Sequence, residues 1–406
     1  MRLIKEIFVL VFILIKYIYV WGLIHLGYRK ILKRNTWLIS EKRTEARDNG
    51  YYMFKYLRHC KVADRVYYSI VSTSQDRNKV ANLGNVIYYN SFMHIALYLG
   101  SKYLLYCQVD SKPYENVHGI GRLDFLCRKN QIRVYLTHGI CKDNVPTSYD
   151  YRCAGYNIFI CGAYPEYEYY KKLYSYPEQN IALTGLCRFD GLINESTKDN
   201  IILIMPTFRD WLRTSDSTKT IASSVECERM KKSDFFKKYS SLLENKDLHN
   251  ILQYSNTRII FYLHYTIQPY THLFKKLLLC DRIKICERWE YDVQDLLKKS
   301  KILITDYSSV AFDFSYMKKP IAYYHFDYAK YRSEHYKEGF FKYSEHGLGP
   351  IIETESVLIE WIRDTIMLNF QMEQKYADRL QNFFVSYDKN NCKRVFEFII
   401  KYNDGK

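Results

Sequence analysis

Two histidines follow apolar runs of this chain, at positions where a side chain could act on a substrate. His138 follows RVYLT and precedes Gly139, and His264 follows RIIFYL. A histidine titrates near neutral pH and can accept a proton from a substrate hydroxyl, while glycine allows close backbone approach. His138 is therefore a candidate general base with Gly139 in support, and a structural histidine beside a turn is the alternative. His264 is either a donor to a phosphate oxygen or an ordinary partly buried histidine.

The segment ITDYSS stands at the end of the expected buried strand KILI and has the character of an anion site. Thr305, Ser308 and Ser309 place three hydroxyls before an expected helix, whose first N–H groups attract anions. The alternative is that Ser308 only caps the helix, which needs one hydroxyl. Asp306 would repel a phosphate, so we expect it to hold the loop or to accept a hydrogen bond from a sugar hydroxyl.

Two charged residues complete the set of candidates. Arg209, in MPTFRD, could grip a phosphate with two parallel hydrogen bonds, and a surface pair with Asp210 is the alternative. Asp143, in LTHGICKD, could orient the imidazole of His138. A diphosphate needs several such groups, because each charged hydrogen bond contributes roughly 1.5 to 3 kcal/mol. The chain has no glycine-rich Walker motif, so P-loop chemistry is not expected.

Short apolar runs that alternate with helical segments predict the elements that position these residues. One series starts at Trp37 and a second near Asn200, so we expect two α/β units with parallel sheets. The polar stretch 194–200 is the expected linker, and a helical tail is expected from Ser356 to Tyr402. The predicted domains are 36–195 and 196–406. Ligands of such sheets bind at the carboxyl ends of strands, where the candidates stand.

The N-terminal segment 1–35 predicts a membrane-attachment helix. Ile7 to Leu26 is nearly all apolar, with Lys16 and His25 inside it and basic residues on both sides. This length can meet a bilayer, but a central lysine costs roughly 2.5 to 3.5 kcal/mol on insertion scales. A full span and a surface-lying helix therefore both stay open. The larger basic cluster after the segment predicts that the rest of the chain is cytoplasmic.

The composition limits the class of partner. The chain has 406 residues, which predicts two core domains, and a net charge of +16, which favours anionic partners such as lipid headgroups or polyphosphates. The basic residues are spread along the chain rather than gathered in a nucleic-acid motif. Eleven cysteines without a C-x-x-C pair predict neither a disulfide framework nor a zinc site, and they favour a reducing compartment.

Several sequence blocks together resemble the CDP-glycerol glycerophosphotransferase family, whose members prime or polymerise teichoic acids and related capsular polymers. The resemblance covers nearly all of the chain after residue 36. The blocks are WLISEKRTEARDNGYYMFKYL, LTHGICKD, CGAYPEYEYY, LTGLCRFDGL, MPTFRD and ITDYSSVAFDFSYMKKPIAYYHFD. Two departures stand out, since His264 precedes Tyr265 where the family usually has proline, and Phe208 stands where many relatives have tryptophan.

The resemblance implies a GT-B-like fold, in which two Rossmann-like domains face each other across an interdomain cleft. It implies transfer of glycerol phosphate from CDP-glycerol to a lipid-linked or polymeric acceptor, with release of CMP, at the cytoplasmic face of the membrane. It implies no metal and no cofactor. The carried-over site has His138 as base and five residues that bind the donor diphosphate: Arg209, His264, Thr305, Ser308 and Ser309.

Three alternatives remain open from the sequence. A CDP-ribitol or other alditol-phosphate transferase would share the cleft, and so would a GT-B sugar transferase that uses a nucleotide-sugar. A non-catalytic membrane-surface binding protein would keep the fold and the basic face. Binding to nucleic acid is the most distant possibility. The sequence does not distinguish a primase from a polymerase.

Overall fold

A computed structural model describes residues 2–26, 35–63, 65–108, 112–114, 117, 120–145, 149–193, 199–215 and 220–405. The chain forms two compact units. The first unit comprises Met1–His138, Pro146–Gly191 and Asp388–Lys406, and the second comprises Gly139–Val145 and Leu192–Tyr387. Most of the predicted linker, residues 194–198, lies outside the described residues.

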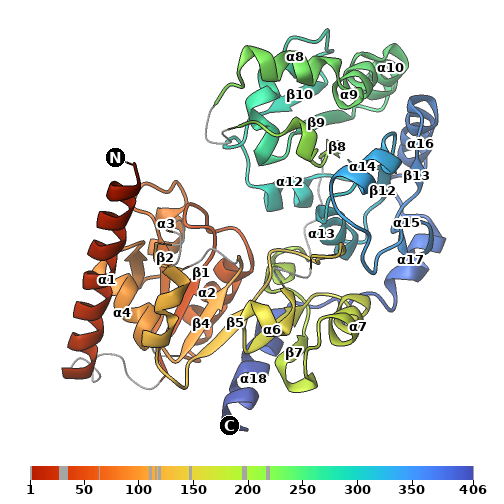
Figure 1. Cartoon of the computed structure of the whole chain (residues 1–406). Helices are drawn as coiled ribbons and strands as arrows, with labels where there is room; N and C mark the ends of the chain where they lie inside the picture. The colour runs from red at the N-terminus through yellow and green to blue at the C-terminus, as the bar shows by residue number, and fades with distance from the viewer. Residues whose placement is uncertain are drawn as a thin grey trace. The chain divides into compact units, whose positions relative to one another are not determined.

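The first unit is built on a parallel sheet with the strand order β3-β2-β1-β4-β5-β6-β7 (Figure 1). Its described strands are β1 Trp37–Ser40, β2 Val66–Ile70, β3 Val86–Tyr88, β4 Tyr103–Tyr106, β5 Ile132–Tyr135, β6 Ile158–Cys161 and β7 Ile181–Leu183. Its described helices are α1 Arg2–Leu26, α2 Asn49–Cys60, α3 Arg77–Ala81, α4 Phe92–Gly100, η2 Ile120–Leu126, α6 Tyr151–Ala154, α7 Tyr164–Leu173, η3 Glu178–Asn180, η4 Cys187–Gly191 and α18 Asn391–Asp404.

The second unit has a parallel sheet with the order β10-β9-β8-β11-β12-β13. Its described strands are β8 Ile201–Ile204, β9 Arg258–Tyr262, β10 Ile283–Cys286, β11 Ile302–Thr305, β12 Ile321–Tyr324 and β13 Ile351–Ile352. Its described helices are η5 Asp210–Leu212, α8 Ser224–Lys232, α9 Asp234–Glu244, α10 Lys246–Tyr254, η6 Tyr265–Tyr270, α11 Thr271–Phe274, α12 Val293–Lys299, α13 Val310–Tyr316, α14 Tyr328–Glu334, α15 Tyr343–His346, α16 Glu355–Met367 and α17 Gln374–Leu380.

Four strands of the two sheets are buried over their whole length and are almost entirely apolar. All four residues of β1, β6, β8 and β11 are buried, as expected for parallel strands. The predicted pair of α/β units with parallel sheets is therefore confirmed. The predicted cleft between two facing domains stays a prediction.

The predicted helical tail is divided between the two units. α16 and α17 belong to the second unit, whereas α18 packs on α2 and η4 of the first. The predicted domain boundary between residues 195 and 196 would place the whole tail in the second domain. In the structure, residues 388–406 belong to the first unit instead. Polar and apolar contacts both hold α18 there. Asp190 accepts hydrogen bonds from the backbone N–H groups of Asn391 and Cys392 at 2.8 and 2.9 Å, and the ring of Phe396 stacks 5.9 Å from that of Trp37 in β1.

Candidate active site

Most of the predicted donor-binding residues gather at one edge of the second sheet. Arg209 and His264 follow β8 and β9, and Thr305 is the last residue of β11. These three strands are neighbours and run in the same direction. The carboxyl ends of these strands therefore lie together. The sequence predicted this placement from the apolar runs alone.

Thr305 and Asp306 join the loops that follow β11 and β8. The Thr305 hydroxyl donates to the carbonyl oxygen of Met205 at 2.7 Å. One carboxylate oxygen of Asp306 accepts the N–H groups of Thr207 at 2.8 Å and Tyr307 at 2.6 Å. Both side chains are fully buried, so they hold the edge of the site together. This agrees with the expectation that Asp306 holds the loop.

Arg209 lies in the core of the second unit rather than at its surface. Its guanidinium forms two parallel bonds to Asp327, at 2.8 and 2.9 Å, and a third contact of 2.9 Å to Asp306. The remaining nitrogen donates to the carbonyl oxygen of Thr207 at 2.6 Å. Although burial opposes its charge, the two aspartates hold the pKa of Arg209 above its ordinary value.

These contacts change the interpretation of MPTFRD. The side chain of Arg209 has no exposed surface, so in this structure it binds carboxylates and not a phosphate in solvent. The alternative surface pair with Asp210 is also wrong, because Asp210 lies 2.9 Å from His335 and 3.3 Å from Arg213. The partner of Arg209 is 118 residues away in the chain, beyond the reach of a local motif.

Aromatic rings enclose this ion pair and a further histidine. The guanidinium of Arg209 lies 4.9 Å from the ring centre of Tyr307, whose hydroxyl donates to Asp327 at 3.0 Å. His325 follows β12 and contacts the carbonyl oxygen of Asp306 at 3.0 Å. Burial lowers the pKa of His325 to about 4, so it is neutral at pH 7. The sequence prediction missed Asp327 and His325, although both stand just after an apolar strand.

The three remaining donor-site candidates are half-buried, in contrast to Arg209. Ser308 accepts a hydrogen bond from the N–H of Val310 at 3.4 Å, and Ser309 makes no capping bond to α13. His264 accepts the N–H of Thr266 at 3.3 Å through Nδ1 and packs 4.7 Å from the ring of Phe208. These side chains keep surface that a ligand could contact.

His138 is an exposed residue of the first unit, three positions after the end of β5. Its Nδ1 lies 3.3 Å from the hydroxyl of Tyr135. When Nδ1 carries the proton and donates it to that oxygen, Nε2 is left as the basic nitrogen. Tyr135 was not among the predicted site residues.

The residue before His138 is held in an unusual backbone conformation. Thr137 has φ = 57°, in the left-handed region that β-branched residues rarely adopt. The side-chain amide of Asn49 donates to the carbonyl oxygen of Thr137 at 2.8 Å, and its oxygen accepts the N–H of Arg188 at 2.9 Å. Asn49 is fully buried. It was missed by the sequence prediction, because its partner is 88 residues away.

Gly139 and Asp143 belong to the second unit, while His138 belongs to the first. Gly139 has φ = 153°, which favours glycine. Asp143 pairs with Lys142 and with Arg332, the latter at 2.7 Å. Burial opposes the ionisation of Asp143, yet Lys142 and Arg332 hold the pKa of its carboxyl below the ordinary value. Asp143 therefore acts as an anchor of residues 139–145, and its predicted role toward His138 stays a prediction.

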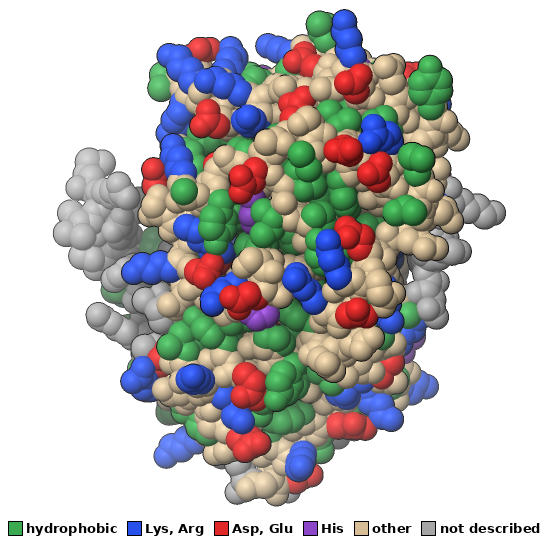
Figure 2. Space-filling view, turned by 90° about the vertical axis from the view of Figure 1, so that its right-hand side faces the viewer, with side chains coloured by type: hydrophobic (Ala, Val, Ile, Leu, Met, Phe, Trp, Pro, Cys, Tyr) green, Lys and Arg blue, Asp and Glu red, His purple; other side chains and the backbone are tan. Residues whose placement is uncertain are grey.

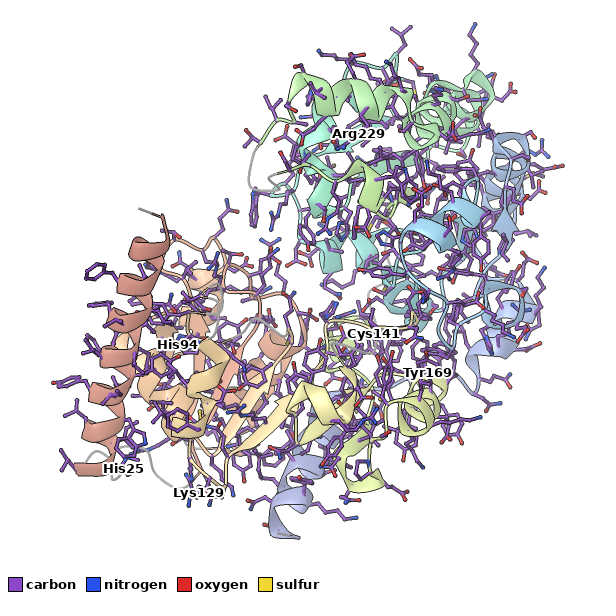
Figure 3. The ribbon with its side chains drawn as sticks, viewed as in Figure 1. His25, His94, Lys129, Cys141, Tyr169 and Arg229 are labelled. Atoms are coloured by element: carbon purple, nitrogen blue, oxygen red, sulfur yellow. The ribbon has the colours of Figure 1, made fainter. Side chains whose placement is uncertain are left out.

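A pocket of about 830 Å³ opens beside the buried ion pair of the second unit. Its wall includes Trp211, Arg229 on α8, Lys330 and Asp327. Arg229 is labelled in Figure 3. The Lys330 ammonium lies 4.8 Å from the centre of the Trp211 ring. Asp327 thus connects Arg209 to a surface where a ligand could bind. Among the described residues, no group of three or more His, Cys, Asp or Glu could hold a metal ion.

Comparisons with known proteins agree with this architecture. The chain is 30% identical over 389 residues to the minor teichoic acid biosynthesis protein GgaB of Bacillus subtilis, covering 95% of this chain and 42% of GgaB. It is 41% identical over 111 residues to a teichoic acid glycerol-phosphate transferase of Staphylococcus aureus, covering 27% and 28% of the two chains. The chain thus spans less than half the length of these curated relatives.

The fold matches solved structures over the full chain. The wall teichoic acid polymerase TagF superposes with a TM-score of 0.68 at 16% identity, covering 100% of this chain and 97% of that one. A UDP complex of S. aureus MnaA superposes with a TM-score of 0.53 at 12% identity over 91% of this chain and 97% of that one. The model of the family "CDP-Glycerol:Poly(glycerophosphate) glycerophosphotransferase" matches residues 23–401. The chain belongs to the CDP-glycerol:poly(glycerophosphate) glycerophosphotransferase family.

Proposed function

We propose that this chain transfers glycerol phosphate from CDP-glycerol to a hydroxyl of a lipid-linked or polymeric acceptor and releases CMP. The family match over residues 23–401 carries the proposal. The relatives named above act, by their names, in teichoic acid synthesis, and one solved TagF structure was soaked with CDPG. A CDP-ribitol donor is the nearest variant, since a teichoic acid poly(ribitol-phosphate) polymerase also matches.

The proposed chemistry assigns the proton transfer to His138. Nε2 of His138 takes the proton of the acceptor hydroxyl as that oxygen attacks the phosphorus next to glycerol. The bond from this phosphorus to the bridging oxygen breaks, and CMP leaves with that oxygen. The hydroxyl of Tyr135 accepts from Nδ1, fixes the tautomer and stabilises the imidazolium that forms. Transfer requires that His138 and a donor bound to the second unit meet at one acceptor hydroxyl.

The proposed donor contacts come from the half-buried residues of the second unit. Ser308 and Ser309 supply hydroxyl donors to the diphosphate, and His264 supplies a ring N–H, because its Nδ1 already accepts from Thr266. Thr305 and Arg209 act as positioning residues, since both are fully buried. Hydrogen-bond donors held in place by the fold can stabilise the charge that develops on the phosphates. No metal or cofactor is included in this proposal.

The proposed location is the cytoplasmic face of the cell membrane, where a lipid-linked acceptor is presented. One helix of the described residues, Phe8–Leu26 within α1, is long and apolar enough to cross a membrane. That property supports attachment through α1. The same helix would bring the first unit, and with it His138, close to an acceptor in the membrane.

A panel of donors tests the proposal. The purified full chain is incubated with CDP-glycerol, CDP-ribitol or a UDP-sugar, each with and without a lipid-linked acceptor extract, and the released nucleotide is measured. We expect acceptor-dependent CMP from CDP-glycerol. Release of UDP alone would establish a sugar transferase instead. No nucleotide from any donor, with an extract that supports a known family member, would favour a binding protein.

Two variants test the donor contacts. Ser308→Ala together with Ser309→Ala should raise the KM for CDP-glycerol by about tenfold or more, because two charge-assisted bonds are lost. Ser333→Ala is the matched control, since Ser333 is an exposed residue of α14 whose hydroxyl donates to the nearby carbonyl of Lys330.

The surface charge gives no support to a nucleic-acid partner, because basic and acidic side chains are interspersed on the face shown in Figure 2.

A further inference from the structure

The pocket of about 830 Å³ in the second unit has apolar walls with basic residues around them. Its apolar lining residues are Trp211, Leu212, Val225 and Phe235. Leu212 and Phe235 are buried, and Val225 is exposed. Ligand pockets usually measure roughly 300 to 1,000 Å³. The volume therefore suits a ligand larger than a single glycerol phosphate.

Three basic side chains from two helices line the pocket. Arg229 and Lys232 stand three positions apart on one face of α8, and Lys330 lies on α14. Nη2 of Arg229 donates to the carbonyl oxygen of Arg213 at 2.7 Å, which orients the guanidinium without neutralising its charge. The Lys330 ammonium lies over the ring of Trp211, an arrangement that likewise keeps its charge. All three basic residues are exposed and can meet a ligand.

The acids in the wall balance this charge only in part. Asp327 is bonded to Arg209 on its buried side, and Glu228 pairs with Lys231 of the same helix at 2.8 Å. Asp234, at the start of α9, is the third acid of the wall and has no ion pair among the described residues. Three basic groups thus stand against one unpaired acid, so the pocket favours an anionic ligand.

The pocket is separate from the proposed donor contacts. Ser308, Ser309 and His264 are not among its lining residues, so the contacts proposed for the donor diphosphate do not use it. The reaction proposed above has one other polyanion, the polymeric acceptor, whose units are joined by phosphodiesters. The chemistry of the pocket therefore points to the acceptor.

We propose that this pocket binds the poly(alditol phosphate) chain of the acceptor, with phosphodiesters at Arg229, Lys232 and Lys330. The inference rests on the proposed function and names a binding site for its polymeric substrate. Each phosphodiester carries one negative charge, and successive phosphates of one chain can meet the basic groups of α8 and α14 together. The alditol carbons between the phosphates can pack on Trp211 and Val225. A single phosphate can use only part of this surface.

Equilibrium dialysis without a donor tests the site. The purified full chain is dialysed against soluble oligomers of six glycerol phosphate or six ribitol phosphate units and against the corresponding monomers. One of the two oligomers should bind at least tenfold more tightly than its monomer. Arg229→Gln with Lys330→Gln should weaken that binding at least tenfold, because contacts from both helices are lost. An oligomer affinity no higher than that of the monomer, for both alditols, would overturn the proposal.

The matched control is Arg363→Gln with Lys375→Gln, which removes the same charge from the same unit. Arg363 on α16 and Lys375 on α17 are exposed and lie outside the wall of the pocket. The control should bind the oligomer within twofold of the wild type, and a melting temperature near the wild-type value establishes that each variant is folded. Equal weakening by both variants would mean attraction to basic surface in general and would overturn the site.

Binding of CDP-glycerol distinguishes the acceptor chain from the donor as the occupant. The pocket variant should bind CDP-glycerol within threefold of the wild type. A loss of CDP-glycerol binding as large as the loss of oligomer binding would assign the pocket to the donor and overturn the proposal. Because the dialysis needs no turnover, a chain that binds the oligomer at this pocket but releases no CMP from CDP-glycerol would refute the proposed function and not the site.

Discussion

The side chain of Asn49 donates a hydrogen bond of 2.8 Å to the carbonyl oxygen of Thr137, the residue before the exposed His138. This bond joins the start of α2 to the end of β5. It holds Thr137 in its left-handed conformation, at φ = 57°, and so determines the direction in which the His138 side chain leaves the backbone. Asn49 is thus a positioning residue for the proposed base.

Replacing Asn49 with Leu should lower kcat about tenfold or more and leave the KM for CDP-glycerol near its wild-type value. The lost bond leaves the carbonyl of Thr137 and the N–H of Arg188 without this partner, at a cost of roughly 1 to 3 kcal/mol. Steady-state kinetics of CMP release separate the two constants. Asn180→Leu is the matched control, since buried Asn180 also donates to a backbone carbonyl, that of Asn157, at 2.6 Å. A kcat lowered equally by both variants would show that Asn49 has only a structural role.

Replacing Arg209 with Lys should destabilise the second unit and leave the donor KM of the folded fraction nearly unchanged. A lysine cannot reproduce the paired bonds to Asp327 together with those to Asp306 and Thr207. Because lysine keeps the positive charge, the expected loss is smaller than the about 3 to 5 kcal/mol that removal of one partner of a buried ion pair costs. Urea unfolding measures this loss.

The control for Arg209 is Arg213→Lys, an exposed arginine paired with Asp210 at 3.3 Å. It should change the free energy of unfolding by about 0.5 kcal/mol or less. A direct phosphate contact by Arg209 would give the reverse pattern for Arg209→Lys, with a raised donor KM and an unchanged stability.

His325 should make the second unit sensitive to acid. Burial lowers its pKa in the folded protein to about 4, whereas an unfolded histidine titrates near 6.5. The neutral form therefore stabilises the fold fully above about pH 6.5, and this contribution is lost as the pH falls toward 4. Between pH 7 and pH 5, this titration lowers the free energy of unfolding by about 2 kcal/mol.

His325→Gln should lose about 2 kcal/mol less stability than the wild type between pH 7 and pH 5. Glutamine keeps a donor toward the carbonyl of Asp306, which His325 contacts at 3.0 Å, and it does not titrate. Urea unfolding at both pH values gives the difference. Identical losses in the two proteins would mean that His325 is not held neutral in the folded unit.

The sequence predicted what depends on local pattern. Three apolar residues before Thr305 and four before Met205 indicated buried strands, and the chemistry-bearing residues at the ends of these strands share one edge of a parallel sheet. The exposure of His138 agrees with its predicted role, which stays a proposal.

What the sequence could not predict depends on partners far apart in the chain. The sequence predicted a phosphate contact for Arg209. Its actual partner, Asp327, stands 118 residues away in the chain, where no local pattern could indicate the pair. Asn49 carries no signal in its own segment beyond a position at a helix start. α18 contacts Asp190 and Trp37 of the first unit, and the apolar period of its own segment does not show which unit it joins.

The most direct test of the account is the rate of acceptor-dependent CMP release from CDP-glycerol by the wild type, His138→Ala and His59→Ala. His59 is an exposed histidine of α2 in the same unit, bonded only to its own helix in the described contacts. The account predicts that His138→Ala loses at least a hundredfold in kcat, within the range of a general base, while His59→Ala matches the wild type. CMP release by His138→Ala at the wild-type rate would contradict it.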